Sequence, residues 1–236
     1  MSVQKFISKQ LKKAGFEIKR FPTIDQRRRY ALWQHFGVNK IIDVGASIGQ
    51  YALLCRRLGF KGKIISFEPL SASFAELQKN KASDTLWLIH NFALGDEATK
   101  TTINVAQNAF SSSLLEMLPA HVHSAPESQY VSQETITIKT LDSIFGTIYE
   151  PNDKIFLKID TQGYERNVLI GAAKSLENIV GLQLEMSLMP LYADEMLFDE
   201  MLHFVQTLGF KLFSLENGFY DKKTGQLLQV DGVFFK

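Results

Sequence analysis

The sequence predicts an α/β fold, with a doubly wound, mostly parallel sheet that ends in an antiparallel hairpin and is preceded by a helical segment. Short apolar runs rich in β-branched residues alternate with segments of helical period, which favours parallel strands joined by helices. A glycine turn follows the first such run, and two strand-like runs lie close together near the end. With 236 residues, 45% of them hydrophobic, the chain can bury the core of one such domain.

The first unit spans residues 40–69 and has the order strand, glycine turn, helix, strand. Ile41 and Val44 are β-branched, as expected for a buried parallel strand. Residues 51–58 have the apolar spacing of a helix, and the second strand ends at Glu68. This order is typical of a nucleoside-binding unit.

The remaining elements continue the alternation. We expect helices at residues 72–81, 167–176 and 194–208, and strands at residues 85–90, 154–159, 180–186, 211–216 and 229–235. The last two strands are separated by the turn-rich pairs Asn217-Gly218 and Thr224-Gly225, which predict an antiparallel hairpin at one side of the sheet.

A long connection, residues 97–150, exceeds a simple crossover. Strand-like residues 101–105 and 135–139 flank a polar stretch in it. We expect an insertion or lid that covers the ligand pocket on its acceptor side, because long loops near strand ends often carry function. The alternative is a solvated connection with a small β-ribbon.

The glycine turn and Glu68 together predict the ligand. Glycines let the backbone approach a ligand closely, and Glu68 stands 23 residues after Gly45, where a carboxylate can accept both ribose hydroxyls. A dinucleotide fingerprint would require glycine at position 47 and glycine or a small residue at position 50, but the chain has Ser47 and Gln50, so NAD is disfavoured. Asp43, ahead of the glycines, would repel a pyrophosphate but can hold an ammonium group. We therefore expect S-adenosyl-L-methionine.

Polar residues close several of the predicted strands, and the carboxyl ends of strands form the ligand site in such sheets. Each has a simpler interpretation alone, as a turn cap, a helix cap or a partner of a lysine. Together they predict a site composed of Asp43, the 45–49 turn, Glu68, Asn91, Asp160 with Gln162, and Glu185.

Five segments resemble the FkbM-like family of S-adenosylmethionine-dependent methyltransferases. They are Ile42-Asp43-Val44-Gly45-Ala46-Ser47-Ile48-Gly49-Gln50-Tyr51, Phe67-Glu68-Pro69, Asn91-Phe92-Ala93-Leu94-Gly95-Asp96, Lys139-Thr140-Leu141-Asp142 and Lys158-Ile159-Asp160-Thr161-Gln162-Gly163-Tyr164-Glu165. The resemblance covers residues 37–236. Ser47 replaces an asparagine often found in the family, and Gln162 stands where many members have glutamate.

The resemblance implies a class I methyltransferase (Rossmann-like) fold and methyl transfer to a hydroxyl, on a sugar, a glycan or a secondary metabolite. The cofactor-binding residues that it implies are Asp43, Gly45, Ala46, Ser47, Gly49, Tyr51, Glu68, Pro69, Asn91, Phe92, Ala93, Asp160 and Gln162.

The implied reaction needs alignment of donor and acceptor and removal of the acceptor proton. Asp160 is the first candidate base because it follows the fourth strand of the fold, where the methyl group should point. Glu165 and Glu185 are candidate helpers, with Lys158 neutralising one of them. A divalent cation such as Mg²⁺ is an alternative means of activating the hydroxyl.

Other activities remain as alternatives. The basic residues concentrate in the first 29 residues, and Asp160-Thr161-Gln162-Gly163 replaces the proline-aromatic motif of base methylation; both features disfavour an RNA methyltransferase. A protein methyltransferase and a non-catalytic methyltransferase-like binding module are further alternatives, the last disfavoured by the intact Asp43, Gly45 and Glu68.

The first 36 residues are predicted to form a basic amphipathic helical extension ahead of a domain at residues 37–236. Nine lysines and arginines stand against two acidic residues in the first 29 positions, although the chain's formal net charge is +1. We expect this helix to pack over the sheet or against another subunit of a homo-oligomer. The alternative is a peripheral membrane contact through residues 2–20.

The composition also indicates in which compartment the protein works and which partners are disfavoured. The near-neutral net charge gives no argument for a nucleic-acid partner, and no run approaches the ~20 apolar residues that span a membrane. The single cysteine, Cys55, favours a reducing, cytoplasmic compartment. The histidines show no zinc-site spacing with it, so no metal ligands are assigned.

Overall fold

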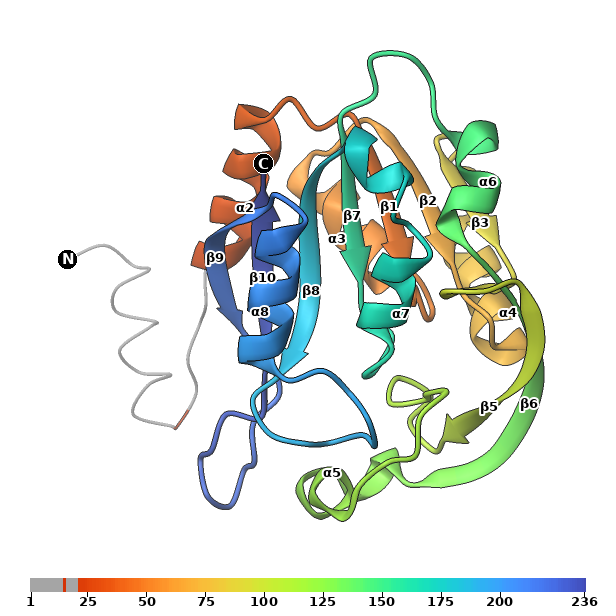
Figure 1. The fold of residues 1–236 in the computed structure, drawn as a ribbon, viewed down its shortest axis with the longest axis vertical. Coiled ribbons are helices and arrows are strands. Elements are labelled where there is room, and N and C mark those ends of the chain that lie inside the picture. The colour runs from red at the N-terminus through yellow and green to blue at the C-terminus, as the bar shows by residue number, and fades with distance from the viewer. Residues whose placement is uncertain (1–14, 16–20) are drawn as a thin grey trace.

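The computed structural model describes residue 15 and residues 21–236. The main sheet contains, in chain order, β1 (Lys40–Val44), β2 (Lys63–Phe67), β3 (Trp87–His90), β7 (Ile155–Ile159), β8 (Ile179–Ser187), β9 (Lys211–Asn217) and β10 (Gln229–Phe235). Their order in space is β3-β2-β1-β7-β8-β10-β9 (Figure 1). The expected doubly wound sheet is therefore confirmed.

The sheet reverses its strand order between β1 and β7. Val44 pairs with Phe67 of β2 on one side and with Ile159 of β7 on the other, all parallel, so these three strands end level with one another. At the far side, β10 runs antiparallel to both β8 and β9. The predicted hairpin is confirmed, and its second strand lies between the first and the rest of the sheet.

Helices cover both faces of the sheet. One face carries α2 (Ile24–His35), α3 (Gln50–Leu58) and α4 (Ser71–Lys81); the other, nearer the viewer in Figure 1, carries α6 (Leu141–Ile148), α7 (Glu165–Ile170) and α8 (Phe198–Thr207). Alternate strand residues face the two layers: Ile41 packs with Trp33 of α2, whereas Ile42 packs in the core that includes Val168 of α7. This alternation is the period of two expected of strands buried on both faces.

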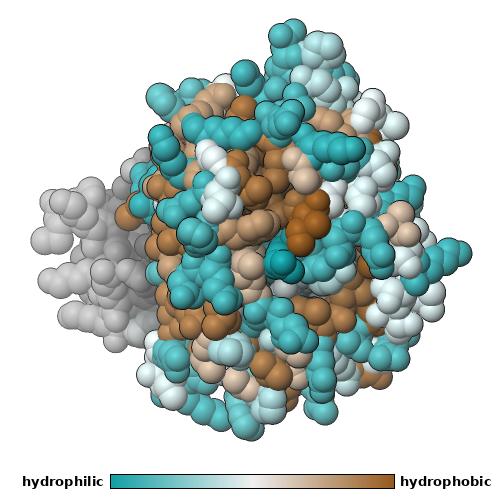
Figure 2. Space-filling view, in the orientation of Figure 1, coloured by the Kyte–Doolittle hydropathy of each residue, from teal (hydrophilic) through white to brown (hydrophobic). Residues whose placement is uncertain are grey.

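Figure 2 shows the face over α6, α7 and α8 as a central apolar area surrounded by polar residues. Ile170, at the end of α7, is 40% exposed. Within the described residues, the helices are too short or too polar to cross a bilayer. The predicted basic helix and its contact with a membrane fall on residues 1–14 and 16–20, which lie outside the described part.

The 97–150 connection supplies two strands of a second, three-stranded sheet, and residues just before it supply the third. This sheet contains β4 (Ala93–Leu94), β5 (Thr99–Ala106) and β6 (Tyr130–Lys139), in the order β4-β6-β5. Residues 107–129, with α5 (Pro119–Ser124), lie at the end of the main sheet to which β1 and β7 point (Figure 1). Leu115 and Met117 of this segment pack against Leu191 and Tyr192, in the loop after β8.

Two of the expected helices are shorter in the structure. The helix expected at 167–176 is divided into α7, which ends at Ile170, and a 3-10 turn (Ser175–Asn178). Gly171, just after α7, lies so close to Gly95 that a Cβ on it would be 1.8 Å from the Gly95 carbonyl oxygen. The helix expected from residue 194 begins at Phe198. Before it, the Glu195 carboxylate accepts hydrogen bonds from the Leu191 and Tyr192 amides.

A buried ion pair anchors the start of β1. The Lys40 side chain is 2% exposed, and its ammonium contacts the Asp153 carboxylate and the Ile148 carbonyl oxygen, both at 2.5 Å. An ammonium buried in this way needs a carboxylate partner, because an unpaired charge in the interior is strongly unfavourable. The pair fixes the central strand to the connection before β7.

Candidate active site

The glycine turn joins the ends of β1 and β7. Gly45 has φ of +76°, and a Cβ on it would lie 1.9 Å from the Asp160 carbonyl oxygen, so only glycine permits this approach. Gly49 has φ of +90°, but its absent side chain leaves room for Trp87 and Leu77. Gly45 therefore permits the close approach of β1 and β7 at the site, whereas Gly49 permits the start of α3 to pack against the core.

Glu68 is held at the end of β2 by the backbone. Its carboxylate accepts hydrogen bonds from the Ser47 amide at 2.8 Å and the Leu70 amide at 2.9 Å, and the residue is 5% exposed. Burial raises the pKa of this carboxyl from 4.5 to about 7, although the two amides oppose the shift. Asn91 donates its side-chain amide to the Glu68 and Pro69 carbonyls and so supports this turn.

Two cavities meet at the carboxyl ends of β1 and β7. The first, here called the Glu68 cavity, has mainly apolar walls, and its lining includes Glu68, Pro69, Leu70, Ala93, Leu94 and Tyr164. The second, called the Lys158 cavity, has a volume of about 330 Å³ and a polar lining that includes Arg29, Tyr51, Lys158, Gln183, Glu216 and Asp231. Gly45, Phe110 and Asp160 line both cavities.

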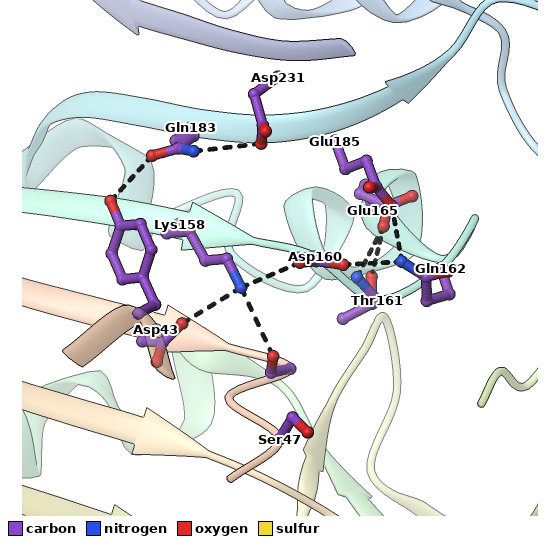
Figure 3. Close-up of polar contacts among 12 residues, drawn as sticks. Asp43, Ser47, Lys158, Asp160, Thr161, Gln162, Glu165, Gln183, Glu185 and Asp231 are labelled. Atoms are coloured by element: carbon purple, nitrogen blue, oxygen red, sulfur yellow. Dashed lines mark hydrogen bonds and ion pairs between the residues drawn. The ribbon is translucent and has the colours of Figure 1, made fainter. Parts of the chain in front are cut away.

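Lys158 lies between two aspartates and pairs with both of them (Figure 3). Its ammonium lies 3.4 Å from an Asp43 oxygen and 3.3 Å from an Asp160 oxygen. Burial lowers the pKa of Lys158, but Asp160 and Asp43 outweigh burial and raise it overall. The expectation that this lysine neutralises Glu165 or Glu185 is replaced by a pairing with the two aspartates, which face it from β1 and from the end of β7.

A second set of polar contacts links α2 to β8, β9 and β10. The Arg29 guanidinium donates to Gln183 at 2.7 Å and lies 3.4 Å from the Glu216 carboxylate. Gln183 also accepts a hydrogen bond from the Tyr51 hydroxyl and donates to Asp231 (Figure 3). Arg29 is only 6% exposed, so this helix contributes a buried cation to the wall of the Lys158 cavity.

Glu165 and Glu185 differ in their relation to Asp160. Glu165 is 4% exposed and accepts hydrogen bonds from the Thr161 amide and hydroxyl. Burial raises the pKa of Glu165 to about 7. Burial, with Asp160 and Asp231 nearby, raises the pKa of Glu185 well above its ordinary value. Glu185 is linked to Asp160 through the amide of Gln162.

The structure brings most of the predicted cofactor residues to the two cavities. Gly45, Ala46, Ser47, Tyr51, Glu68, Pro69, Ala93, Asp160 and Gln162 line one cavity or both. The other four do not line either cavity. Asp43 is fully buried under Lys158, Gly49 and Asn91 contact the chain as described above, and Phe92 packs against Phe67.

Several residues of the site were not expected from the sequence. Arg29 was counted only among the nine basic residues of the N-terminal extension, and Gln183 and Asp231 lie within strands rather than at their ends. Phe110 is 54% exposed at the junction of the cavities. A polar residue inside an otherwise apolar strand is the signal that could have identified Gln183, because such residues need a partner when buried.

Magnesium remains without assigned ligands. Among residues 15 and 21–236, the His, Cys, Asp and Glu side chains form no group of three or more placed to hold a metal ion. The acidic residues near Asp160 are linked by Lys158 and Gln162.

The strand order, with an antiparallel strand inserted before the last position and polar residues at the ends of β1, β2 and β7, defines a class I, Rossmann-like methyltransferase fold. The family is shown by sequence. The methyltransferase FkbM domain matches residues 43–212, and the chain belongs to this family.

Two curated relatives are methyltransferases. The chain is 27% identical over 142 residues to hexuronic acid methyltransferase AglP of Haloferax volcanii, covering 58% of this chain and 51% of that protein. It is 26% identical over 142 residues to methyltransferase 1 of Beauveria bassiana, covering 56% and 57%. The matches thus span little more than half the length of either relative.

Solved structures of similar fold show lower identity. The methyltransferase FkbM from Methylobacillus flagellatus is 15% identical with a TM-score of 0.49, covering 83% of this chain and 43% of that chain. TehB from Haemophilus influenzae is 10% identical with a TM-score of 0.47, covering 88% and 60%.

Proposed function

We propose that this methyltransferase uses S-adenosyl-L-methionine and transfers the methyl group to a hydroxyl, on a sugar, a glycan or a secondary metabolite. The observation that carries the proposal is the position of Asp160. Its side chain is 36% exposed and lines both the Glu68 cavity and the Lys158 cavity. A carboxylate at that junction can face a cofactor on one side and an acceptor hydroxyl on the other.

The residues of the Glu68 cavity fit the cofactor. Each Glu68 oxygen accepts one backbone hydrogen bond and retains capacity for a ribose hydroxyl. Leu70, Ala93 and Leu94 supply apolar walls suited to an adenine ring. The buried Ser47 hydroxyl has no hydrogen-bond partner within the described structure, and a polar group of the cofactor tail would satisfy it.

The proposed chemistry places a base beside an activated donor. The bound cofactor would supply a sulfonium methyl group, which is already electrophilic. Asp160 would accept the proton of the acceptor hydroxyl while the methyl group passes from the sulfonium sulfur to the hydroxyl oxygen, which would leave the cofactor as a neutral thioether. The Lys158 ammonium, 3.3 Å from one Asp160 oxygen, helps to hold the carboxylate in place. Phe110 and the walls of the Lys158 cavity would orient the acceptor.

The Lys158 cavity supports a hydroxylated acceptor. Its wall offers planar hydrogen-bonding groups from Arg29, Gln183 and Asp231, and the exposed ring of Phe110 stands at its edge. Such groups can both donate to and accept from hydroxyls, and an aromatic ring can cover the apolar face of a sugar. The name of the Haloferax relative, a hexuronic acid methyltransferase, supports including uronic acids among the acceptors tested.

The test has a binding arm and a transfer arm. Calorimetric titration with S-adenosylmethionine, S-adenosylhomocysteine and NADH should show binding of the first two only, and Glu68→Ala should abolish it. Mass spectrometry should then detect methylated products from a panel of neutral and acidic sugars. Asp160→Asn should lower kcat by about 10²–10⁴-fold and leave binding of S-adenosylhomocysteine unchanged. Full transfer by this variant would contradict the base assignment.

A further inference from the structure

Gln162 joins four segments at the site through its side chain and its backbone carbonyl. Its amide nitrogen donates to Asp160 at 2.9 Å and to Glu185 at 2.6 Å (Figure 3). Its amide oxygen accepts from the Tyr192 hydroxyl at 2.7 Å. Its backbone carbonyl accepts from the Ser113 hydroxyl at 2.7 Å. Both N–H groups of the amide are therefore used on carboxylates from different strands.

This pattern requires a neutral amide. Tyr192 donates to the amide oxygen, and the opposite orientation of the amide would direct that oxygen at two carboxylates. A glutamate at position 162 would place three carboxyl groups within hydrogen-bond distance, and like charges so close disfavour ionisation. Glutamine satisfies both carboxylates without adding charge.

The backbone of Gln162 is in a conformation that L residues rarely adopt. Its φ is +56°, and that of Gly163 is +95°, so two successive left-handed residues turn the chain after β7. This conformation is strained for a residue with a Cβ. The hydrogen bonds of the side chain and the carbonyl offset this strain, which indicates that the turn serves to aim the side chain.

The Asp160 carboxylate is consequently held from two sides. One oxygen accepts from Gln162 at 2.9 Å, and the other lies 3.3 Å from the Lys158 ammonium. These contacts fix the plane of the carboxylate, while a third of the side chain stays exposed to the cavities. A base that acts on a bound hydroxyl needs such a fixed orientation.

We propose that Gln162 is a positioning residue that fixes the Asp160 carboxylate between two donors, so that it faces the acceptor hydroxyl. This inference rests on the proposed function, in which Asp160 is the base. It differs from a cofactor contact, because the amide acts on Asp160 and its two N–H groups are already used within the protein.

Removal of the Gln162 donor should release one oxygen of the Asp160 carboxylate, because the Lys158 ammonium holds only the other oxygen. Other groups also act on Asp160 and stay in place in a Gln162 variant. They are Lys158 on β7, Asp43 from β1, Glu165 from α7, Glu185 from β8, Asp231 from β10 and Tyr192 from the loop after β8.

The experiment is carbon-detected NMR of the Asp160 carboxyl in the full chain at one fixed pH, with the signal assigned by its loss in Asp160→Asn. Gln162→Met should shift the carboxyl carbon resonance of Asp160, because one oxygen loses the N–H that it accepts. Gln229→Met is the matched control, because Gln229 donates to Glu185 at 3.1 Å but not to Asp160. The Asp160 resonance of this control should match that of the wild type.

Kinetic and binding measurements complete the test. Gln162→Met and Gln162→Glu should both lower kcat by about 10–10²-fold, with unchanged affinity for S-adenosylhomocysteine. A wild-type Asp160 resonance in Gln162→Met, or a loss of S-adenosylhomocysteine affinity equal to the loss in kcat, would overturn the positioning role. The NMR measurement does not depend on transfer, so an inactive wild type would count against the proposed function while the resonance still decides the role of Gln162.

Discussion

Gly45→Ala should damage the site and the stability of the sheet together. The alanine Cβ would lie 1.9 Å from the Asp160 carbonyl oxygen, far inside van der Waals contact. The clash is with backbone, so no side-chain rotation can relieve it. The ends of β1 and β7 would have to separate, and these ends carry the residues shared by the two cavities.

The expected loss has two parts. A residue with a Cβ at φ of +76° costs about 1–2 kcal/mol. Forcing an extra methyl group into a packed interior typically costs about 1–3 kcal/mol. We therefore expect Gly45→Ala to lower the free energy of unfolding by about 2–5 kcal/mol, a large part of the ~5–15 kcal/mol of an ordinary domain.

Urea denaturation followed by circular dichroism measures this loss, with Gly209→Ala as the matched control. Gly209 has φ of +87°, but no atom lies within 4 Å of the Cβ position, so its variant should show the conformational cost alone. Gly45→Ala should also bind S-adenosylhomocysteine at least about tenfold more weakly. Equal destabilisation of the two variants, or wild-type binding by Gly45→Ala, would refute the role of the close approach.

Two further predictions concern buried charges. Affinity for S-adenosylhomocysteine should fall about tenfold from pH 8 to pH 6, because ribose hydroxyls donate to the ionised Glu68 and its pKa of about 7 leaves it mostly protonated at pH 6. Calorimetry at both pH values tests this, and a flat profile in the wild type would contradict it. Asp153→Ala should lower stability by about 3–5 kcal/mol by leaving the Lys40 ammonium unpaired. Lys40→Met with Asp153→Ala should recover most of that loss in urea denaturation; an equal loss in both would show that charge pairing is not the cause.

The sequence predicted the local elements well where the pattern was strong. The runs at 154–159 and 180–186 are strands within a residue of their expected ends, because buried parallel strands are mostly apolar runs. The antiparallel strand at 229–235 also has its expected ends. Helix α6 was not expected, although the Thr140-Leu141-Asp142 segment begins it: Thr140 caps the helix, and Asp142 binds the Ser175 amide. These residues stabilise the fold beside α7 rather than contacting the cavities.

By itself, the sequence determined the sheet, the glycine turn, the placement of Glu68 and Asp160 at strand ends, and the family. These features depend on residue order and on the fixed periods of strands and helices. Only the tertiary structure decided which charges meet. Arg29 reaches Gln183, 154 positions away, and Lys158 pairs with Asp43 and Asp160 rather than with a glutamate. Such pairings depend on strand order and side-chain direction across the sheet, and spacing along one chain does not contain that information.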